Sequence, residues 1–361
     1  MFLVYIISFL LSLSLIVLVH EFGHFIVARW CGVKVVAFSV GFGKKIWART
    51  DKYGTEWRIC PIPLGGYVQM FGDEDAASMK KSDTTLSEED KKKTFFAQKL
   101  YKRAAIIFAG PFMNYLFAVV LLTGILFTFG YPHIPAVIGK VMDGSAAQAM
   151  DLHPGDRVLQ INDTQIDDFT DLQKTMLFIQ KGEPAVVRVQ REDKELVLRF
   201  TPATDQDRPR LGVMADVSQP YTFEKYSIPA SFGKAWQMVY EMSCDTLRYI
   251  GLMLSGQRSA DELRGPLGIA EASGDAMRAG WISFILFMIQ ISVSVGLLNL
   301  LPLPLLDGGH LAIYAVEAVT RHQMSKKLEE WCMRVGLALL IALFVFTLWK
   351  DIPRIIGRIF S

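Results

Sequence analysis

The chain has 361 residues, 51% of them hydrophobic, and its formal net charge at pH 7 is only +2. This length is enough for two or three domains, and the nearly balanced charge gives no sign of a nucleic-acid-binding protein. The four cysteines are scattered without C-x-x-C spacing, which supports neither a disulfide framework nor a cysteine zinc site: they are Cys31, Cys60, Cys244 and Cys332.

Long uncharged apolar runs predict four transmembrane helices, because each is long enough, or nearly so, to cross a hydrocarbon core of about 30 Å. The predicted spans cover residues 1–30, 104–131, 279–306 and 334–352, and Arg334 and Lys350 bracket the last. We interpret the first span as a retained helix, since no Lys or Arg precedes its apolar core and no A-x-A-like cleavage site follows it. The chain is therefore predicted to be a multi-pass α-helical membrane protein.

Residues 31–72 alternate β-branched and aromatic residues with glycines, including a G-x-G at Gly41 and Gly43 and the pair Gly65-Gly66. This pattern predicts short strands with tight turns. Next to a membrane span, such strands can re-enter the membrane from the cytoplasmic side if protein covers their backbone. The stretch that follows, residues 73–103, is rich in charges and is expected to be a solvated loop.

The distribution of charge predicts the orientation in the membrane. Between residues 28 and 103 Lys and Arg outnumber Asp and Glu, whereas between residues 131 and 281 the acidic residues outnumber the basic ones. By the positive-inside rule, the first of these segments is cytoplasmic and the second lies outside. The C-terminal tail, with Lys350, Arg354 and Arg358, does not fit this rule.

The outer segment begins with a domain that we expect to span residues 134–216. Its pattern GSAAQAMDLHPGDRVLQIND, followed by two alternating strands, resembles PDZ domains of the bacterial type. Such domains accept an extended peptide by strand addition, and Leu211-Gly212-Val213 is a candidate for the loop that receives the end of the peptide. Residues 217–278 follow, and within them residues 231–263 predict an amphipathic helix that lies on a surface instead of spanning the membrane.

The first span contains His20-Glu21-Phe22-Gly23-His24, an H-E-x-x-H motif. Residues i and i+4 of a helix share a face, so both imidazoles can reach one metal ion. Glu21 points off that face and can hold a water molecule as general base. Three ionisable groups inside a membrane helix are costly, which makes a purely structural role the weaker interpretation. The motif therefore predicts a metal site with two histidine ligands and Glu21 as the catalytic residue.

A catalytic zinc takes three protein ligands and keeps one position open. The third ligand is expected from the end of the third span, which carries N-L-L-P-L-P-L-L-D-G-G-H from Asn299 to His310. Asp307 is the only acidic residue there, and two prolines break the helix at a depth where irregular backbone lines a site. We predict Asp307 as the third ligand, although it could instead cap the helix expected within residues 307–333. His310 is an alternative ligand, and Asn299 is suited to gripping a substrate or to a helix–helix hydrogen bond.

The second span carries Gly110-Pro111-Phe112-Met113-Asn114 near its predicted cytoplasmic end. Small residues there allow helices to pack closely, and Asn114 can bond across them, so we interpret this run as structural. Interrupted stretches of three spans thus fall at one predicted depth.

Together these motifs resemble the site-2 protease family of intramembrane zinc metalloproteases, most closely its bacterial RseP-like members. The matching runs cover nearly the whole chain in order: H-E-F-G-H at 20–24, G-F-G at 41–43, L-G-G-Y-V at 64–68, G-P-x-x-N at 110–114, G-P-x-G-I-A at 265–270 and N-x-x-P-x-P-x-L-D-G-G-H at 299–310. The resemblance implies a Zn2+ ion on His20, His24 and Asp307, with Glu21 as base. The best-known RseP-like proteases carry two PDZ domains in tandem, whereas this chain has room for one.

The same resemblance implies hydrolysis of a peptide bond within or next to the transmembrane segment of single-pass membrane proteins, such as anti-sigma-factor-type regulators or remnant signal peptides. It implies a bacterial plasma (inner) membrane, with the active site near the cytoplasm and the PDZ domain outside. The partners would be these substrates, a peptide or ectodomain remnant at the PDZ domain, and the bilayer. An edge strand of the β element would hold the substrate extended. The residues expected to contact the substrate are Asn299, Gly41, Gly43, Gly66 and Tyr67.

Three other interpretations fit less well. An aspartyl protease would need a second intramembrane aspartate beside Asp307. A metal transporter has no use for a general base between the ligands or for an outer peptide-binding domain. A non-catalytic scaffold or chaperone with a relic metal site would have no reason to keep four costly buried groups intact.

Overall fold

The computed structural model describes residues 2–72, 87–179, 182, 184–201, 211–216, 218, 222–259, 265–322 and 324–360. The chain forms two units, each discontinuous in sequence. The helical unit comprises Met1–Thr123, Lys234–Ser243 and Leu263–Ser361, and the β-rich unit comprises Gly124–Gly233 and Cys244–Glu262. Residues 73–86, the first part of the expected charged loop, lie outside the described residues.

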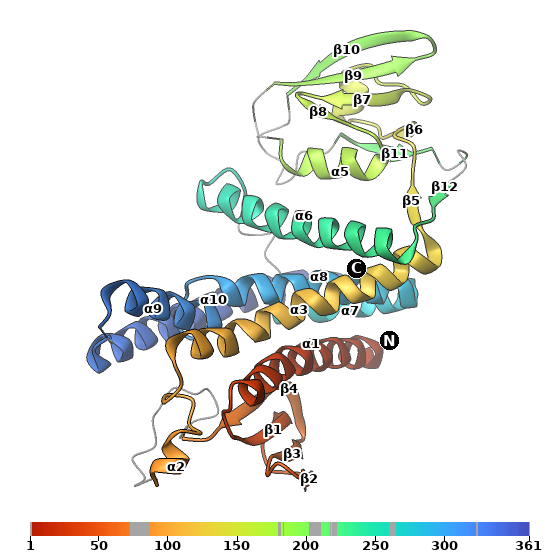
Figure 1. The fold of residues 1–361 in the computed structure, drawn as a ribbon. Coiled ribbons are helices and arrows are strands. Elements are labelled where there is room, and N and C mark those ends of the chain that lie inside the picture. Colours follow the sequence, from red (N-terminus) through yellow and green to blue (C-terminus); the bar gives the residue numbers. More distant parts are fainter. Residues whose placement is uncertain are drawn as a thin grey trace. The chain divides into compact units, whose positions relative to one another are not determined.

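The helical unit is built mainly from long apolar helices (Figure 1). They are α1 (Phe2–Trp30), α3 (Leu100–Phe129), α7 (Pro266–Ala279), α8 (Trp281–Leu300), α9 (Asp307–Thr320) and α10 (Lys326–Phe360), with the short α2 (Glu88–Lys91) before α3. Within the described residues, four stretches are long and apolar enough to cross a membrane: Leu3–Trp30, Leu100–Phe129, Trp281–Leu300 and Glu330–Pro353. One such stretch corresponds to each span predicted from the sequence.

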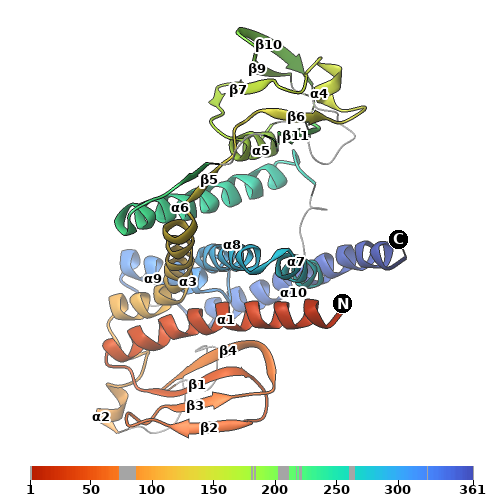
Figure 2. The same cartoon turned by 90° about the vertical axis from the view of Figure 1, so that its right-hand side faces the viewer.

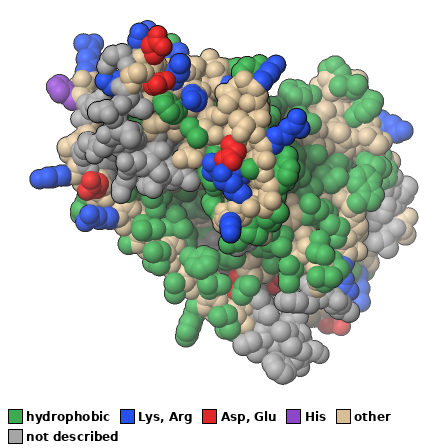
Figure 3. Space-filling model, turned by 90° about the horizontal axis from the view of Figure 1, so that it is seen from below, with side chains coloured by type: hydrophobic (Ala, Val, Ile, Leu, Met, Phe, Trp, Pro, Cys, Tyr) green, Lys and Arg blue, Asp and Glu red, His purple; other side chains and the backbone are tan. Residues whose placement is uncertain are grey.

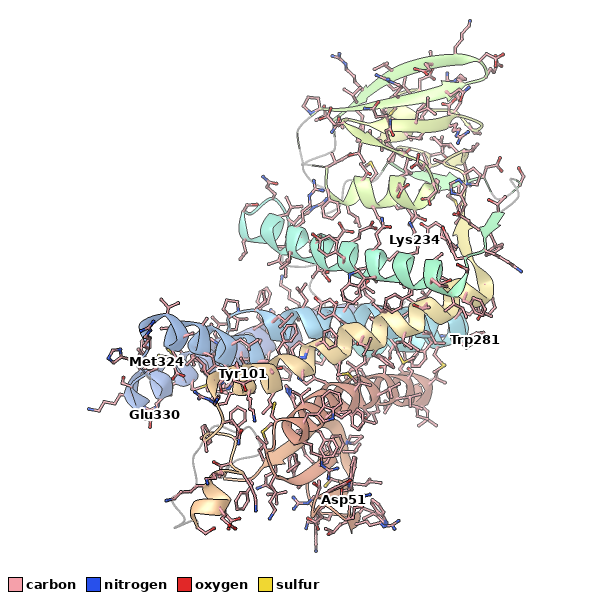
Figure 4. The ribbon with its side chains drawn as sticks, viewed as in Figure 1. Asp51, Tyr101, Lys234, Trp281, Met324 and Glu330 are labelled. Atoms are coloured by element: carbon pink, nitrogen blue, oxygen red, sulfur yellow. The ribbon has the colours of Figure 1, made fainter. Side chains whose placement is uncertain are left out.

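The surface of this unit is suited to lipid. On α10, large hydrophobic side chains are exposed on successive turns, among them Leu340, Phe344 and Trp349. Hydrophobic side chains also cover a wide area of the face in Figure 3. Tyr101 and Trp281, which are 65% and 59% exposed, lie at opposite ends of the helices (Figure 4). Aromatic side chains favour the two edges of the hydrocarbon layer, so their positions fit helices that cross it.

The structure differs from the prediction at the third and fourth spans. The third was expected to run over residues 279–306, but α8 begins after Gly280 and ends at Leu300. It ends early because Pro302 and Pro304 have no N–H group to continue the helical hydrogen bonds. The fourth was expected over residues 334–352, but α10 is longer and begins at Lys326.

A four-stranded sheet lies against α1 (Figure 2). Its strands are β1 (Val35–Phe42), β2 (Trp47–Thr50), β3 (Glu56–Ile59) and β4 (Ile62–Met70), in the order β2-β3-β1-β4. Strand β1 pairs parallel with β3 and antiparallel with β4, so β4 is an edge strand of this sheet. The rings of Phe25, Phe38 and Trp57 pack together, with centroids 5.4, 5.1 and 4.8 Å apart. This aromatic core joins the sheet to α1 and brings β4 alongside the helix.

Helix α7 lies within residues 217–278, which we expected to form an extracytoplasmic amphipathic helical segment. It packs against α1, α8 and α10 and belongs to the helical unit. Ser8 of α1 and Ser273 of α7 share a hydrogen bond of 3.1 Å. The hydroxyl of Tyr5 donates to Asp275 at 2.9 Å. Polar side chains that are typical of a surface helix are therefore satisfied here by side chains of α1.

The β-rich unit is a mixed α/β structure. Its elements are β5 (Tyr131–His133), β6 (Ile138–Val141), α4 (Ala146–Ala149), β7 (Arg157–Ile161), β8 (Thr164–Gln165), α5 (Phe169–Leu177), β9 (Ala185–Arg191), β10 (Lys194–Phe200), β11 (Val213–Ala215), β12 (Thr222–Glu224) and part of α6 (Ile228–Leu254). One sheet has the order β10-β9-β7-β8, and β6 and β5 pair with β11 and β12. Ile138, Val158 and Val187 are fully buried in its core. The helix predicted over residues 231–263 ends earlier, at Leu254.

Candidate metal centre

Two histidines lie on one face of α1, near its C-terminal end. The Nε2 atoms of His20 and His24 are 3.2 Å apart, and the residues are only 8% and 7% exposed. Nδ1 of His24 donates to the main-chain oxygen of Ile106 at 2.8 Å, and Nδ1 of His20 is 3.2 Å from Nδ2 of Asn114. Metal-binding histidines are usually held in this way, because a bond at one ring nitrogen orients the other toward the metal.

Asp307 reaches these histidines because the chain turns sharply after α8. A Cβ atom on Gly308 would lie 2.2 Å from the main-chain oxygen of Leu301, and one on Gly309 would lie 2.3 Å from that of Leu303. Only glycine allows the backbone to approach so closely. The D-G-G run therefore makes possible the turn that brings the carboxylate back to α1.

The three predicted ligands converge on one point, with one ligand atom from each residue within 4.8 Å of the others. Oδ2 of Asp307 is 3.1 Å from Nε2 of His20, and Oδ1 is 3.7 Å from Nε2 of His24. A tetrahedral ion with bonds of about 2.0 Å holds its ligand atoms about 3.3 Å apart, so the spacing fits zinc.

The carboxylate of Asp307 also lacks the partners of an ordinary buried acid. Its Oδ2 is buried without a hydrogen-bond donor among the described residues. Because the ring hydrogen of His24 is on Nδ1, its Nε2 has none to give. Buried acceptors that face one another without a donor are costly, and a cation between them removes that cost. Two nitrogens, one carboxylate oxygen and an open fourth position are the ligand set of a catalytic zinc.

Glu21 lies between the ligands and the sheet. A Cβ atom on Gly66 of β4 would be 3.7 Å from Cγ of Glu21. The Glu21 carboxylate accepts a hydrogen bond from the backbone of Val68, which is also in β4. The predicted base is therefore next to both the metal ligands and the edge strand.

Helix α3 forms the wall behind the histidines. Ile106, Gly110 and Asn114 are spaced four residues apart and share one face of the helix. A Cβ atom on Gly110 would lie 2.3 Å from Nε2 of His24 and 2.8 Å from Nε2 of His20. From the sequence alone, we interpreted this run as structural. The i, i+4 spacing of Gly110 and Asn114 was the signal that could have linked it to the metal centre.

The N-L-L-P-L-P-L-L-D-G-G-H run contains two further candidate site residues, His310 and Asn299. His310, the alternative ligand, is half-buried on α9 with its ring centroid 6.4 Å from that of Tyr314. It is not among the converging ligand atoms. Asn299 is half-buried one residue before the end of α8, and its side chain makes no hydrogen bond to the described residues.

The other predicted substrate contacts belong to the sheet. Gly41 lies where the pairing of β1 with β4 shifts register, and it has a φ of +88°. Gly43 follows directly after β1, with a φ of +103°. The hydroxyl of Tyr67 accepts a hydrogen bond of 3.0 Å from Nη1 of Arg58, and its ring stacks on Phe42. These residues and Gly66 lie in or directly beside the paired strands β1 and β4, of which β4 is the edge strand.

Comparison with known proteins agrees with this chemistry. The model of peptidase family M50 matches residues 8–343. A protein of Agrobacterium fabrum named "Putative zinc metalloprotease Atu1380" is 38% identical over 98% of this chain and 97% of its own length. Metalloprotease MmpA of Caulobacter vibrioides is 34% identical over 98% of this chain and 96% of its own length. Among solved structures, the PDZ domain of an SdrC-like protein from Listeria monocytogenes covers 24% of this chain and 88% of that chain, at 16% identity and a TM-score of 0.20. The chain therefore belongs to peptidase family M50, the site-2 protease family, and is a zinc metalloprotease.

Proposed function

We propose that this protease cleaves within the membrane, hydrolysing a peptide bond within or next to the transmembrane segment of single-pass membrane proteins. One observation supports this proposal most. His20, Glu21 and His24 lie on α1, which is long and apolar enough to span a membrane, and Asp307 follows a second helix of that kind. In a membrane, a peptide bond would reach them by entering the hydrocarbon layer.

The side chains have separate tasks in this reaction. A zinc ion held by His20, His24 and Asp307 would polarise the scissile carbonyl and the attacking water. Glu21 accepts a proton from that water and delivers it to the leaving amine. Asn299 holds the substrate backbone or the developing oxyanion through its amide, which is not engaged by the described residues.

We propose that the substrate binds as an added strand on β4. Within the described sheet, β4 pairs with β1 on one side only, and its Gly66 lies beside Glu21. A scissile bond in a helix is shielded by the helix's own hydrogen bonds, so the substrate must unwind. Hydrogen bonds to β4 would replace those that unwinding breaks. In this proposal Gly41, Gly43 and Tyr67 shape the same edge.

Helix-weakening residues near the cut should therefore accelerate cleavage. Replacing such residues by leucine in a tagged substrate is expected to slow the reaction, because leucine favours the helix. The measurement is the initial rate for matched substrates that differ only at these positions. Equal rates would contradict the unwinding step.

We further propose that the protein lies in a bacterial inner membrane, with its metal centre toward the cytoplasm and residues 134–216 outside as a PDZ domain. The charge distribution of the loops supports this orientation. The PDZ domain would bind a peptide or an ectodomain remnant of the substrate at Leu211-Gly212-Val213. A protease site inserted between β9 and β10, at Glu192-Asp193, should be cut from outside intact spheroplasts. One inserted at Lys52 should be cut only after lysis.

The central experiment is cleavage of a tagged single-pass substrate by purified protein in liposomes. Wild type, Glu21→Gln and chelator-treated wild type are compared, and zinc is then returned to the treated sample. Cleavage by untreated and zinc-restored wild type alone is the expected result. Equal cleavage in all samples would contradict the zinc mechanism. No cleavage of any substrate in a panel would favour a membrane scaffold instead.

A further inference from the structure

Asn114 is a polar side chain with an unusual environment. It is 0% exposed, its Nδ2 is 3.2 Å from Nδ1 of His20, and its Oδ1 is buried without a hydrogen-bond partner among the described residues. Ser292 of α8 donates to its main-chain oxygen at 2.9 Å, which ties this turn of α3 to α8. A buried amide oxygen without a donor is costly, so its position requires an explanation.

The chemistry of a ligating histidine supplies that explanation. When Nε2 of His20 binds zinc, it carries no hydrogen, and the single hydrogen of the neutral ring is on Nδ1. Nδ1 can then only donate. An amide NH2 group cannot accept that hydrogen, whereas an amide oxygen can. The nitrogen of Asn114 beside Nδ1 therefore suits only the tautomer of His20 that cannot bind the metal through Nε2.

The two amide orientations differ by a half-turn about the Cβ–Cγ bond. That rotation exchanges Oδ1 and Nδ2, which have nearly the same size, and it needs no movement of α3. It places the unpartnered oxygen of Asn114 against Nδ1 of His20. Both the buried oxygen and the ring hydrogen are then satisfied.

We propose that Asn114 is a positioning residue of the zinc site, and that its side-chain oxygen accepts the Nδ1 hydrogen of His20 and so presents Nε2 to the metal. This inference rests on the zinc site of His20, His24 and Asp307. His24 is held in the same way, because its Nδ1 donates to the main-chain oxygen of Ile106, two turns earlier on the same face of α3. One helix thus fixes the tautomer of both histidine ligands, once through its backbone and once through Asn114.

The test measures zinc affinity of the full-length protein in detergent by competition with a chromogenic chelator. Asn114→Asp keeps an acceptor at the same place, and Asn114→Leu has a similar size but no acceptor. Ser8→Ala is the matched control, since it removes another buried hydrogen bond between helices, three turns before His20. The visible spectrum of the cobalt-substituted protein reports ligand geometry in each variant.

Loss of an outer partner of a metal ligand weakens metal binding on the order of 10–100-fold, and this is the expected effect of Asn114→Leu. Asn114→Asp should bind zinc at least as tightly as wild type, since a carboxylate is the stronger acceptor. Ser8→Ala should bind zinc like wild type. Its cobalt spectrum and that of Asn114→Asp should also match wild type, whereas that of Asn114→Leu should not.

Wild-type zinc affinity in Asn114→Leu would overturn the proposal. A roughly tenfold lower zinc affinity of Asn114→Asp would overturn the proposal as well, because the amide N–H group and not the oxygen would then support zinc binding. The comparison of Asn114→Asp with wild type therefore tests the proposal even if Asn114→Leu does not fold. Cleavage is measured separately from zinc binding. If wild type binds zinc but cuts no substrate, the proposed substrate class is contradicted. The role of Asn114 is then still tested by the zinc affinities of the variants.

Discussion

Gly110 of α3 and His24 of α1 are so close that only glycine fits between the two helices. A Cβ atom on Gly110 would lie 2.3 Å from Nε2 of His24, the nitrogen that faces Asp307. His20 and His24 are both buried, so neither ring can move away into solvent. The close contact of α1 and α3 is therefore a condition for the metal site.

Gly110→Ala should accordingly lower zinc affinity by at least the order of tenfold and lower proteolysis with it, because the added methyl group pushes both rings off the metal. Gly124→Ala on the same helix is the matched control, since a Cβ atom there meets no atom within 4 Å. That control should keep full zinc affinity. It should also be slightly more stable, by up to about 1 kcal/mol, because alanine is the better helix former. Equal zinc affinities for the two variants would show that the close contact of Gly110 with the two histidines is not required for zinc binding.

Asp51, which is labelled in Figure 4, connects the sheet to α1 through Arg29. It accepts hydrogen bonds from Nη2 of Arg29 at 2.5 Å and from Nε1 of Trp57 at 3.2 Å. Burial acts to raise the pKa of Asp51, but the hydrogen bonds from Arg29, Thr55 and Trp57 outweigh it and lower the pKa to about 2. The carboxylate of Asp51 is therefore charged, and keeps its hydrogen bonds to Arg29 and Trp57, over the pH range in which the enzyme can be assayed.

Asp51→Ala should reduce proteolysis without loss of zinc, because the sheet places β4 beside Glu21 while the metal ligands come from helices. We expect a decrease in kcat/KM of about tenfold, which corresponds to about 1.4 kcal/mol. Lys45→Ala is the control on the same sheet, since the Lys45–Glu56 ion pair is exposed and such pairs contribute little. Loss of zinc from Asp51→Ala would contradict this separation of roles.

The long apolar helices of the fold could be predicted from the sequence. A chain must keep its apolar residues in long helices to cross a membrane, so the four candidate spans follow from hydropathy. The placement of His20, Glu21 and His24 on one helix follows from the H-E-x-x-H spacing. The approach of Asp307 to the two histidines was harder to predict, because it depends on the turn after α8. Only the structure shows that this turn brings the backbone of Gly308 against that of Leu301.

Contacts between distant segments could not be predicted in this way. Helix α7 has the polar side chains of a surface helix, and only the structure shows that Tyr5 and Ser8 of α1 satisfy Asp275 and Ser273. The role of Gly110 was hidden for a related reason. A small residue in a membrane helix indicates close packing, but the sequence does not say that the neighbour is an imidazole.

The start of α7 is capped by a residue far along the chain. Asp351 of α10 is fully buried, and its carboxylate accepts hydrogen bonds from the N–H groups of Gly268 at 2.9 Å and Gly265 at 3.2 Å. Asp351→Ala should lower the melting temperature in detergent through a loss of about 1–2 kcal/mol, because it leaves the first N–H groups of α7 without an acceptor. Asp351→Asn keeps one oxygen and should lose less. Zinc affinity should not change in either variant, and a parallel loss of zinc would show that α7 also supports the metal site.

The β-rich unit contains a buried ion pair that predicts how its stability changes with pH. Asp156 is 0% exposed, and it accepts hydrogen bonds from Nε and Nη2 of Arg191 at 2.8 and 2.9 Å and from the N–H of His153 at 2.8 Å. Burial acts to raise the pKa of Asp156, but these hydrogen bonds outweigh it and hold the pKa below its ordinary value of 3.8. A carboxyl group whose pKa is lowered by folding stabilises the fold at pH values above its unfolded pKa, and this stabilisation is lost as the pH falls from there through the folded pKa.

Amide hydrogen exchange of the full-length protein can measure this effect in peptides from β7 and β9, with rates corrected for the intrinsic dependence of exchange on pH. In wild type, protection should stay level above about pH 5 and fall steeply below about pH 4, as Asp156 becomes protonated and releases Arg191. Asp156→Asn should be less protected at neutral pH, because it breaks a buried pair, and its protection should change less with acid. The helices should not show this difference between the variant and wild type. If Asp156→Asn shows the same steep acid loss as wild type, another group is responsible for the acid sensitivity of this unit.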